Sequence, residues 1–339
     1  MRCRAPRSVA LCLLAAALAL PLSGCIHLDL GLGRGGKMKE RVLEGTARPK
    51  VLLVEIDGVL TEEEERESLG LEGREAITSY VYEVLQRAKE DPDVRALVLR
   101  INSPGGTITA SDVVYEEIRR FKAETSLPIV VQMMGIAASG GYYVAMAGDR
   151  IYANPTTVTG SIGVIFVGVN LSGFLQKLGI ADQTLVAGAR KDSGSWLRPM
   201  RPEERAQLQG VLDEMHGRFE SVVAQGRPSL TRARVDELAD GRVYTAEQAK
   251  ENGLVDEIGY LPDSIAYAAA QAGLAQGDYR VVTYARSRER KENIYSKAGP
   301  AAEPDARAMP ETIRLELPRE LARPNGQAGF LYLWAPGVE

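Results

Sequence analysis

The sequence predicts an α/β fold in which parallel strands alternate with helices, and three observations indicate it. Short unbroken apolar runs, bounded by turn residues, are typical of strands that are buried on both faces. Between these runs lie stretches with apolar residues at 3.6-residue spacing, the pattern of an amphipathic helix. The chain contains no internal repeat. We therefore expect one copy of a core built from right-handed strand–helix–strand units.

The first half of this core follows from five segments. Each expected strand is an apolar run with few interruptions, and each expected helix carries one apolar stripe. The strands are 51–56, 97–101 and 129–133, and the helices are 75–90 and a second one with Val114, Ile118 and Phe121 on its apolar face. Since the strands are joined through helices, we expect them to run parallel.

The second half continues the alternation. Short strands are expected at 150–153, 164–166 and 184–186, and a long helix with an apolar stripe at 202–225. Residues Thr245–Gln248 form a capping box that predicts a short helix, which Gly253 terminates. The last expected helix is rich in alanine and starts at Pro262.

The N-terminus has the pattern of a targeting segment. Three arginines precede an apolar run at 9–22, which is short for a membrane-spanning helix. The run ends in Leu-Ser-Gly-Cys25, which resembles a bacterial lipobox. We therefore expect a signal peptide at 1–24 and lipidation at Cys25, the alternative being an uncleaved signal anchor. In both cases the protein is attached to a membrane and faces outward.

Composition excludes several classes of function. The chain has 339 residues, a net charge of −4 and no basic footprint for nucleic acid. Cys3 and Cys12 lie inside the removable segment, which leaves Cys25 as the one thiol of the mature chain. We therefore expect no intramolecular disulfide, no cysteine metal cluster and no cofactor.

The most informative stretch for chemistry is 135–143, which contains Ser139 between small residues and directly before two glycines. It follows an expected strand and turns helical, so free backbone N–H groups lie near the serine. Taken alone, such a serine is more often a helix N-cap. The turn Asn102–Gly106 ends another expected strand, where α/β sheets place ligand sites. The amides of Gly106 and Gly140 are therefore expected to form an oxyanion hole.

A nucleophilic serine needs a base, and the two histidines do not supply one. His27 lies beside the expected lipid anchor, and His216 lies at the edge of the apolar stripe of a long helix. The alternative is a lysine whose pKa is lowered by burial, so that a free amine takes the hydroxyl proton. Lys191, in a segment rich in Gly, Ala and Ser, is the candidate. Without other observations it reads as a surface lysine.

Together these motifs resemble the short bacterial form of the signal peptide peptidase A family over roughly residues 50–275. The motifs are Asn102–Gly106, Ala138–Tyr143, Thr159–Gly163, Ala189–Asp192, Gly241–Thr245 and Gly253–Glu257. The resemblance implies a crotonase-like (ClpP-like) core and a serine protease with a Ser/Lys dyad. Ser139 is then the nucleophile, Lys191 the general base and Ser161 the hydroxyl that orients the lysine amine. Gly106 and Gly140 are implied as oxyanion donors.

The resemblance also implies partners and domains. Homo-oligomers in which Ser and Lys come from adjacent subunits are expected, with remnant signal peptides and other unstructured apolar peptides as substrates. The expected parts are the signal peptide at 1–24, a linker at 25–49, the peptidase domain at 50–285 and a largely flexible extension at 286–339. The apolar residues 330–334 are expected to dock on this subunit or on a neighbour.

Two other functions stay open at this point. The same core serves acyl-CoA hydratases and isomerases, which are cytosolic and use carboxylates. A second alternative is a catalytically inactive lipoprotein that binds peptides. Chemical labelling of Ser139 separates both from a protease.

Overall fold

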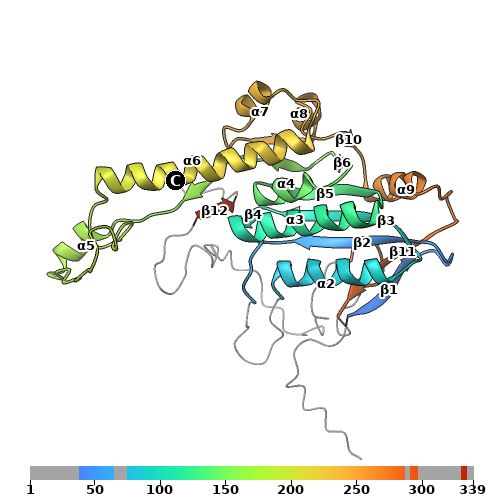
Figure 1. Ribbon diagram of the computed structural model, residues 1–339, viewed down its shortest axis with the longest axis horizontal. Coiled ribbons are helices and arrows are strands. Elements are labelled where there is room, and N and C mark those ends of the chain that lie inside the picture. Colours follow the sequence, from blue (N-terminus) through green and yellow to red (C-terminus); the bar gives the residue numbers. More distant parts are fainter. Residues whose placement is uncertain (1–37, 65–74, 287–290, 297–329, 334–339) are drawn as a thin grey trace, which may run out of the picture. The chain divides into compact units, whose positions relative to one another are not determined.

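The computed structural model describes residues 38–64, 75–286, 291–296 and 330–333. A sheet of mostly parallel strands lies at its centre (Figure 1). Its strand order is β1 (Lys39–Glu44), β11 (Arg280–Ala285), β2 (Lys50–Asp57), β3 (Val94–Ser103), β5 (Ile129–Ala138), β6 (Arg150–Ala153) and β10 (Glu257–Ile258). The expected signal peptide at 1–24 and Cys25 lie outside the described residues. In the part of the chain that is described, no helix is both long and apolar enough to cross a bilayer.

The central strands and helices confirm the α/β prediction. They are β2 (Lys50–Asp57), α2 (Ile77–Glu90), β3 (Val94–Ser103), α3 (Ile108–Thr125) and β5 (Ile129–Ala138). Strand β3 runs parallel to both β2 and β5, as strands joined through helices must. Each of these elements contains or overlaps the segment that the sequence predicted for it.

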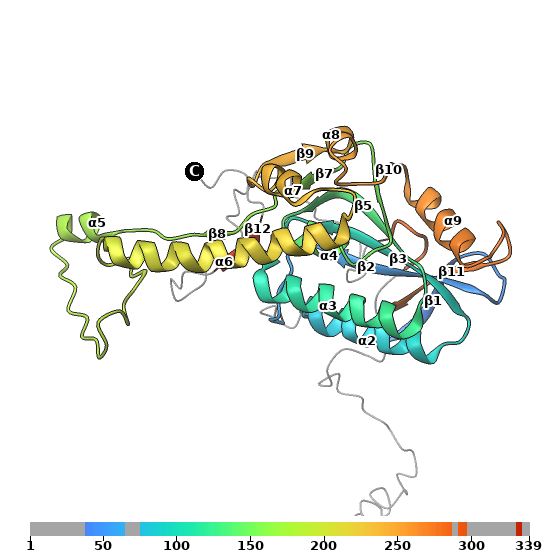
Figure 2. The same ribbon diagram turned by 45° about the horizontal axis from the view of Figure 1, so that its top comes forward.

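Alternate side chains of β2 point to opposite faces of the sheet, and each face has its own cluster of buried apolar residues. Leu52 and Val54 face one cluster, which includes the buried sides of α2 and α3. Val51 and Leu53 face the other cluster, which includes Leu261 on helix α9 (Leu261–Gln271). Successive side chains of a strand point to opposite faces, so a run that is apolar throughout is covered on both. Figures 1 and 2 show α2 and α3 together, with α9 on the other face.

The elements that were predicted in the second half of the chain lie where they were expected, except for one segment. Strand β6 (Arg150–Ala153), helix α6 (Pro202–Gly226), the capping box of α8 (Ala246–Glu251) and α9 lie where they were expected. The strand predicted at 184–186 is wrong. Leu185 is 97% exposed, and no neighbouring strand pairs with this segment. A threonine and two apolar residues without a pairing partner do not form a strand.

The folded domain begins earlier than the sequence indicated. Strand β1 (Lys39–Glu44), placed in the linker by the prediction, pairs antiparallel with β11 (Arg280–Ala285) at the edge of the sheet. Four of its six residues are charged, and their side chains are partly or fully exposed. An edge strand with so many charges lacks the apolar alternation that reveals a strand in a sequence.

A buried ion cluster fixes part of the expected C-terminal extension. Arg100 donates to the Glu55 carboxylate at 2.7 Å, and Lys291 also pairs with Glu55. The guanidinium of Arg100 further donates to the carbonyl oxygens of Ile294 and Ser296, at 2.6 and 3.0 Å. Residues 291–296 of the expected C-terminal extension are therefore held against β2 and β3. Of that extension, the structure describes residue 286, 291–296 and strand β12 (Phe330–Leu333).

Helix α6 extends well beyond the sheet, with α5 (Ser172–Lys177) near its outer end (Figures 1 and 2). Its C-terminal half buries Phe219, Val222 and Val223. Leu208 and Val211, in the outer half, are only partly buried. The apolar stripe of this helix is therefore longer than the core that one copy of the chain offers it.

An ion pair fastens the inner end of α6 to the sheet. Arg227 donates two hydrogen bonds to the carboxylate of Asp256, at 2.9 and 2.7 Å, and a third to the carbonyl oxygen of Gly253. The amide of Ile151 on β6 donates to the same carboxylate at 2.8 Å. Burial raises the pKa of Asp256, but the bonds from Arg227 and Ile151 outweigh it, so the pKa lies below the ordinary value.

We predict that Asp256→Asn lowers the free energy of unfolding by about 2 kcal/mol at neutral pH. The native pKa is lowered, so the carboxylate stabilises the fold above its unfolded pKa of about 4 and loses this effect as the pH falls through the native pKa. The difference between wild type and variant should therefore shrink in acid, as measured by denaturant unfolding. Asp278→Asn, at an exposed position, is the matched control. An equal loss in both variants would contradict the prediction.

Candidate active site

Ser139 lies at the junction between β5 and α4 (Gly140–Ala145) and is 1% exposed. Its amide donates to the carbonyl oxygen of Gly160 at 2.8 Å, and its own carbonyl oxygen accepts from the amide of Tyr143 at 2.9 Å. The backbone of the serine is thus held on both sides.

The conformation of Ser139 is strained. Its φ is 52° and its ψ is −117°, a region that costs a non-glycine residue about 1–3 kcal/mol. Although the residue occupies the N-cap position of α4, its side chain makes no capping hydrogen bond. The N-cap role that such a serine usually has is therefore not the role of this hydroxyl. Strain of this kind clusters at functional sites.

The two glycines expected as oxyanion donors come close together. Strand β4 (Gly105–Thr107) is bound to Leu60: the amide of Leu60 donates to Gly105 and the amide of Thr107 donates to Leu60. Amides alternate along a strand, so the N–H of Gly106 faces the opposite side. A methyl group built at Gly105 would lie 2.8 Å from the nitrogen of Gly140, whose N–H is left free by the helix start. Both donors therefore border the same small space.

This space excludes side chains, which makes glycine substitutions informative. In Gly106→Ala, the new methyl group would lie 2.0 Å from the carbonyl oxygen of Leu60, so the backbone must shift. We expect Ser139 to react with a fluorophosphonate about 10²-fold more slowly, because a displacement near 1 Å has that effect on catalytic geometry.

The matched control is Gly210→Ala on the exposed outer half of α6, where nothing lies within 4 Å of the new methyl group. This variant should label at the wild-type rate and unfold at a slightly higher temperature, since alanine favours a helix by up to about 1 kcal/mol over glycine. Wild-type labelling of Gly106→Ala would show that its amide is not part of the site.

Ser161 lies directly beside the serine junction. Strand β7 (Val158–Gly160) pairs with β5, so that Ala138 lies opposite Gly160. Ser161 follows with a φ of 49°, and its amide donates to the carbonyl oxygen of Arg242 at 2.8 Å. The residue is 8% exposed. The chain thus brings Ser139, Ser161, Gly106 and Gly140 into one neighbourhood.

Lys191 does not join this neighbourhood within one copy of the chain. It lies in the segment between α5 and α6, its side chain is exposed, and that side chain makes no ion pair or hydrogen bond with the described residues. The neighbouring Arg190 donates to Gln207 on the outer half of α6, whereas Phe219 on the same helix contacts Tyr143 beside the site. Gln207 and Phe219 are twelve residues apart on α6, which corresponds to about 18 Å along the helix axis.

A group of buried aromatic rings beside the site was not identified from the sequence. The ring of Tyr143 contacts those of Tyr115, Phe219 and Tyr332, with centroids 5.4, 5.0 and 5.3 Å away. The hydroxyl of Tyr143 donates to Asp112 at 2.6 Å. We call Tyr115, Tyr143 and Phe219 the aromatic socket. Tyr143 stood in the quoted motif, but nothing local in the sequence links it to residues on α6 or near the C-terminus.

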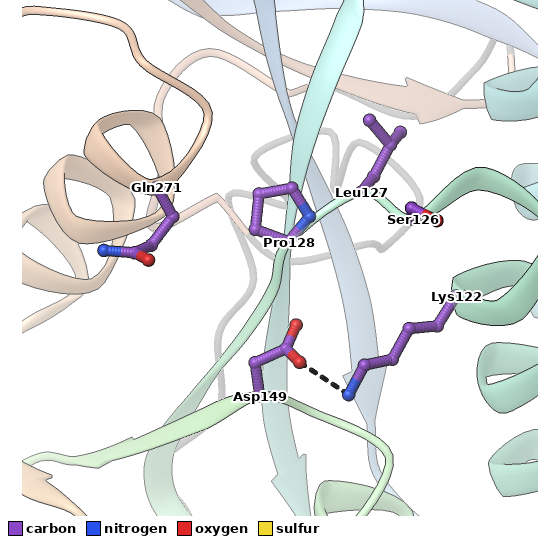
Figure 3. A pocket seen from close by; sticks show the side chains of 6 residues that line it. All are labelled: Lys122, Ser126, Leu127, Pro128, Asp149 and Gln271. Atoms are coloured by element: carbon purple, nitrogen blue, oxygen red, sulfur yellow. Dashed lines mark ion pairs between the residues drawn. The ribbon is translucent and has the colours of Figure 1, made fainter.

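Two other features of the structure do not supply a site. A pocket lined by Lys122, Ser126, Leu127, Pro128, Asp149 and Gln271 holds an ion pair of 2.6 Å between Lys122 and Asp149 (Figure 3). It lies at the start of β5, whereas Ser139 follows the end of that strand. Among the described residues, no group of His, Cys, Asp and Glu is arranged to hold a metal ion. His216 lies 3.8 Å from Glu220 on its own helix.

Comparison with protein families gives two matches that both include Ser139. The model described as peptidase family S49 matches residues 122–275, and the model described as Clp protease matches 63–159. The second match agrees with the expected ClpP-like core.

Three individual relatives are likewise named as peptidases or proteases. An Enterococcus faecium protein named after signal peptide peptidase SppA is 40% identical over 228 residues, which are 67% of this chain and 65% of that protein. A Synechocystis protease is 42% identical over 185 residues, which are 55% of this chain and 66% of that protein. Protease 4 of Salmonella typhi is 38% identical over 192 residues, which are 57% of this chain and 31% of that protein. The chain thus spans slightly less than two thirds of the first two relatives.

Proposed function

Because the chain belongs to peptidase family S49, we propose that it is a serine endopeptidase with Ser139 as its nucleophile. The proposal rests on the backbone conformation and the free hydroxyl of Ser139. Its backbone is strained at a strand–helix junction, and its hydroxyl is not used for capping. The amides of Gly106 and Gly140 border the same space. A buried serine with these neighbours is suited to acyl transfer.

The proposed reaction has two steps. The hydroxyl oxygen of Ser139 attacks the peptide carbonyl carbon while Lys191 takes the hydroxyl proton, and the amides of Gly106 and Gly140 stabilise the oxyanion. The C–N bond then breaks, the proton passes to the leaving amine, and an ester with Ser139 remains. Water hydrolyses the ester in the second step. Ser161 orients the amine of Lys191.

We propose further that Lys191 reaches Ser139 of a neighbouring copy in a homo-oligomer. The segment that carries Lys191 exposes several large apolar side chains, and α5 buries none of its residues. Leu178 and Leu185 are 58% and 97% exposed, and Phe174 on α5 is 60% exposed. Apolar surface of this extent is typical of a protein–protein contact. A second copy would cover it and complete the site.

The proposed location is the outer side of a bacterial membrane, with the chain tethered through a lipid on Cys25. The motif before Cys25 supports this tether, and an uncleaved anchor would give the same attachment. Remnant signal peptides and other unstructured apolar peptides are the proposed substrates, since small and aliphatic segments suit an apolar groove that binds extended chains.

The test uses the purified full chain in mild detergent. We expect a fluorophosphonate to label Ser139, identified by mass spectrometry, and an unstructured signal-peptide sequence to be cleaved. A protein that binds the peptide without labelling or cleavage would be the inactive peptide-binding lipoprotein. Hydratase or isomerase activity on an acyl-CoA, without labelling, would place the chain among the crotonase enzymes.

A further inference from the structure

The exposed segment that carries Lys191 is held by polar bonds rather than by apolar packing. From 163 to 203, where every residue is described, none is buried. In Figure 2 the segment runs as a loop from α5 to the outer end of α6. The amide of Lys191 donates to the carbonyl oxygen of Gly188 at 3.1 Å, so the lysine lies in a tight turn. A loop outside the core needs further contacts to keep one conformation, because ordering its backbone costs conformational entropy.

The side chain of Arg198 supplies these contacts. Its Nε donates to the carboxylate of Asp192 at 2.7 Å, and one Nη atom donates to the carbonyl oxygen of the same residue at 3.1 Å. Both Nη atoms donate to the carboxylate of Glu204, at 2.9 and 2.6 Å. The remaining N–H donates to the carbonyl oxygen of Pro199 at 3.1 Å. All five N–H groups of the guanidinium are therefore used.

Glu204 anchors this network in helix α6. Its side chain is fully buried, and its carboxylate also accepts from the amide of Arg201 at the helix start, at 3.1 Å. Arg201 in turn donates to the carbonyl oxygen of Ala189 at 3.3 Å. The hydrogen bonds from Arg198 lower the pKa of Asp192 and of Glu204, so both carboxylates stay ionised at neutral pH. The loop is thus bonded to the start of α6 on both sides of its lysine.

We propose that Arg198 is a positioning residue for the reaction, because by joining Asp192 to Glu204 it holds Lys191 where it meets the serine of a neighbouring copy. This role rests on the proposed function, in which the lysine is the general base. Asp192 follows Lys191 directly in the chain, so a shift of its carboxylate moves the backbone that carries the amine. A displacement of about 1 Å lowers the rate of a catalysed step about 10²-fold.

The first test compares Arg198→Gln and Arg198→Lys with wild type, using the full-length protein and an unstructured apolar peptide. We expect kcat to fall about 10²-fold in Arg198→Gln while KM changes less than twofold, since a misplaced base slows the chemical step and leaves peptide binding intact. In Arg198→Lys, kcat should fall at least tenfold, because an ammonium group has three donors and lacks the planar fork. Arg205→Gln, at an exposed position of α6, is the matched control and should keep the wild-type kcat.

The second test determines whether Arg198 acts through the lysine. The double variant Lys191→Ala/Arg198→Gln should cleave at the rate of Lys191→Ala alone, because a base that is absent cannot be misplaced. A further loss in the double variant would overturn the positioning role. So would a change of oligomer size in Arg198→Gln, measured by mass spectrometry, since Arg198 would then act on assembly.

Two outcomes separate this role from the proposed function. Unchanged kcat in Arg198→Gln would overturn the positioning role alone, whereas wild-type cleavage by Lys191→Ala would overturn the lysine as the proposed base. Should Arg198→Gln not fold, Asp192→Ala removes the other end of the same bond. The expected fall in kcat is then at least tenfold, and the double variant with Lys191→Ala again decides.

Discussion

Replacement of Ser139 by alanine is expected to reduce peptide cleavage about 10⁴-fold or more and to abolish fluorophosphonate labelling. Removal of a catalytic nucleophile leaves only the rate acceleration that comes from substrate binding and oxyanion stabilisation. The fold should persist, because the hydroxyl makes no capping bond in α4. Labelling, steady-state kinetics and thermal unfolding of the same preparation together check the expectation.

The matched control is Ser126→Ala. Ser126 also has a positive φ, 55°, but it is exposed and lies at the C-cap of α3. Both substitutions place alanine in an unfavourable backbone region, so they share this effect on stability. Only Ser139→Ala should lose activity. Comparable losses in both variants would mean that backbone strain, and not the Ser139 hydroxyl, accounts for the effect.

Replacement of Lys191 by alanine is expected to reduce cleavage about 10³-fold or more, the upper range for a general base. The described residues offer the side chain of Lys191 no partner within one chain, so its loss should leave the stability of the protomer unchanged. Lys177→Ala, on α5 in the same exposed arm, is the matched control and should retain activity. Wild-type activity in Lys191→Ala would remove this lysine from the mechanism.

Mixing the two inactive variants tests where the lysine acts. If each site takes its serine and its lysine from different copies, random co-assembly of Ser139→Ala and Lys191→Ala protomers restores an intact site wherever an unaltered serine meets an unaltered lysine. At equal amounts this gives about one quarter of the sites. The measurement is activity after dissociation and joint reassembly. No recovery, with mixed oligomers demonstrated by mass spectrometry, would place both residues in the same copy.

The central fold could be predicted because its signals are local. An unbroken apolar run such as 51–56 predicts a strand covered on both faces, and the helices beside it carry regular apolar stripes. Strand β1 was missed because its charges hide the alternation. The segment at 184–186 was predicted as a strand because apolar composition alone cannot show whether a pairing partner exists.

The candidate site also contains residues that local sequence patterns predict and residues that they do not. Ser139, Gly140 and Gly106 follow predicted strands, so the topology of a parallel sheet brings them together. Ser161 follows β7, a strand that the sequence did not predict. The contact between Tyr332 and the aromatic socket joins residues about 190 apart in sequence, and no local pattern encodes it. The proposed contact of Lys191 with another copy is equally invisible in one sequence.

The exposed position of Lys191 ties catalysis to protein concentration. If the lysine serves the serine of a neighbour, a diluted solution of protomers loses specific activity as the assemblies dissociate, even though every molecule stays folded. A lipid on Cys25 would confine the copies to a plane and raise their effective concentration. Under that arrangement the enzyme is active where its copies are concentrated on the bilayer, and it loses activity once it is released from the bilayer.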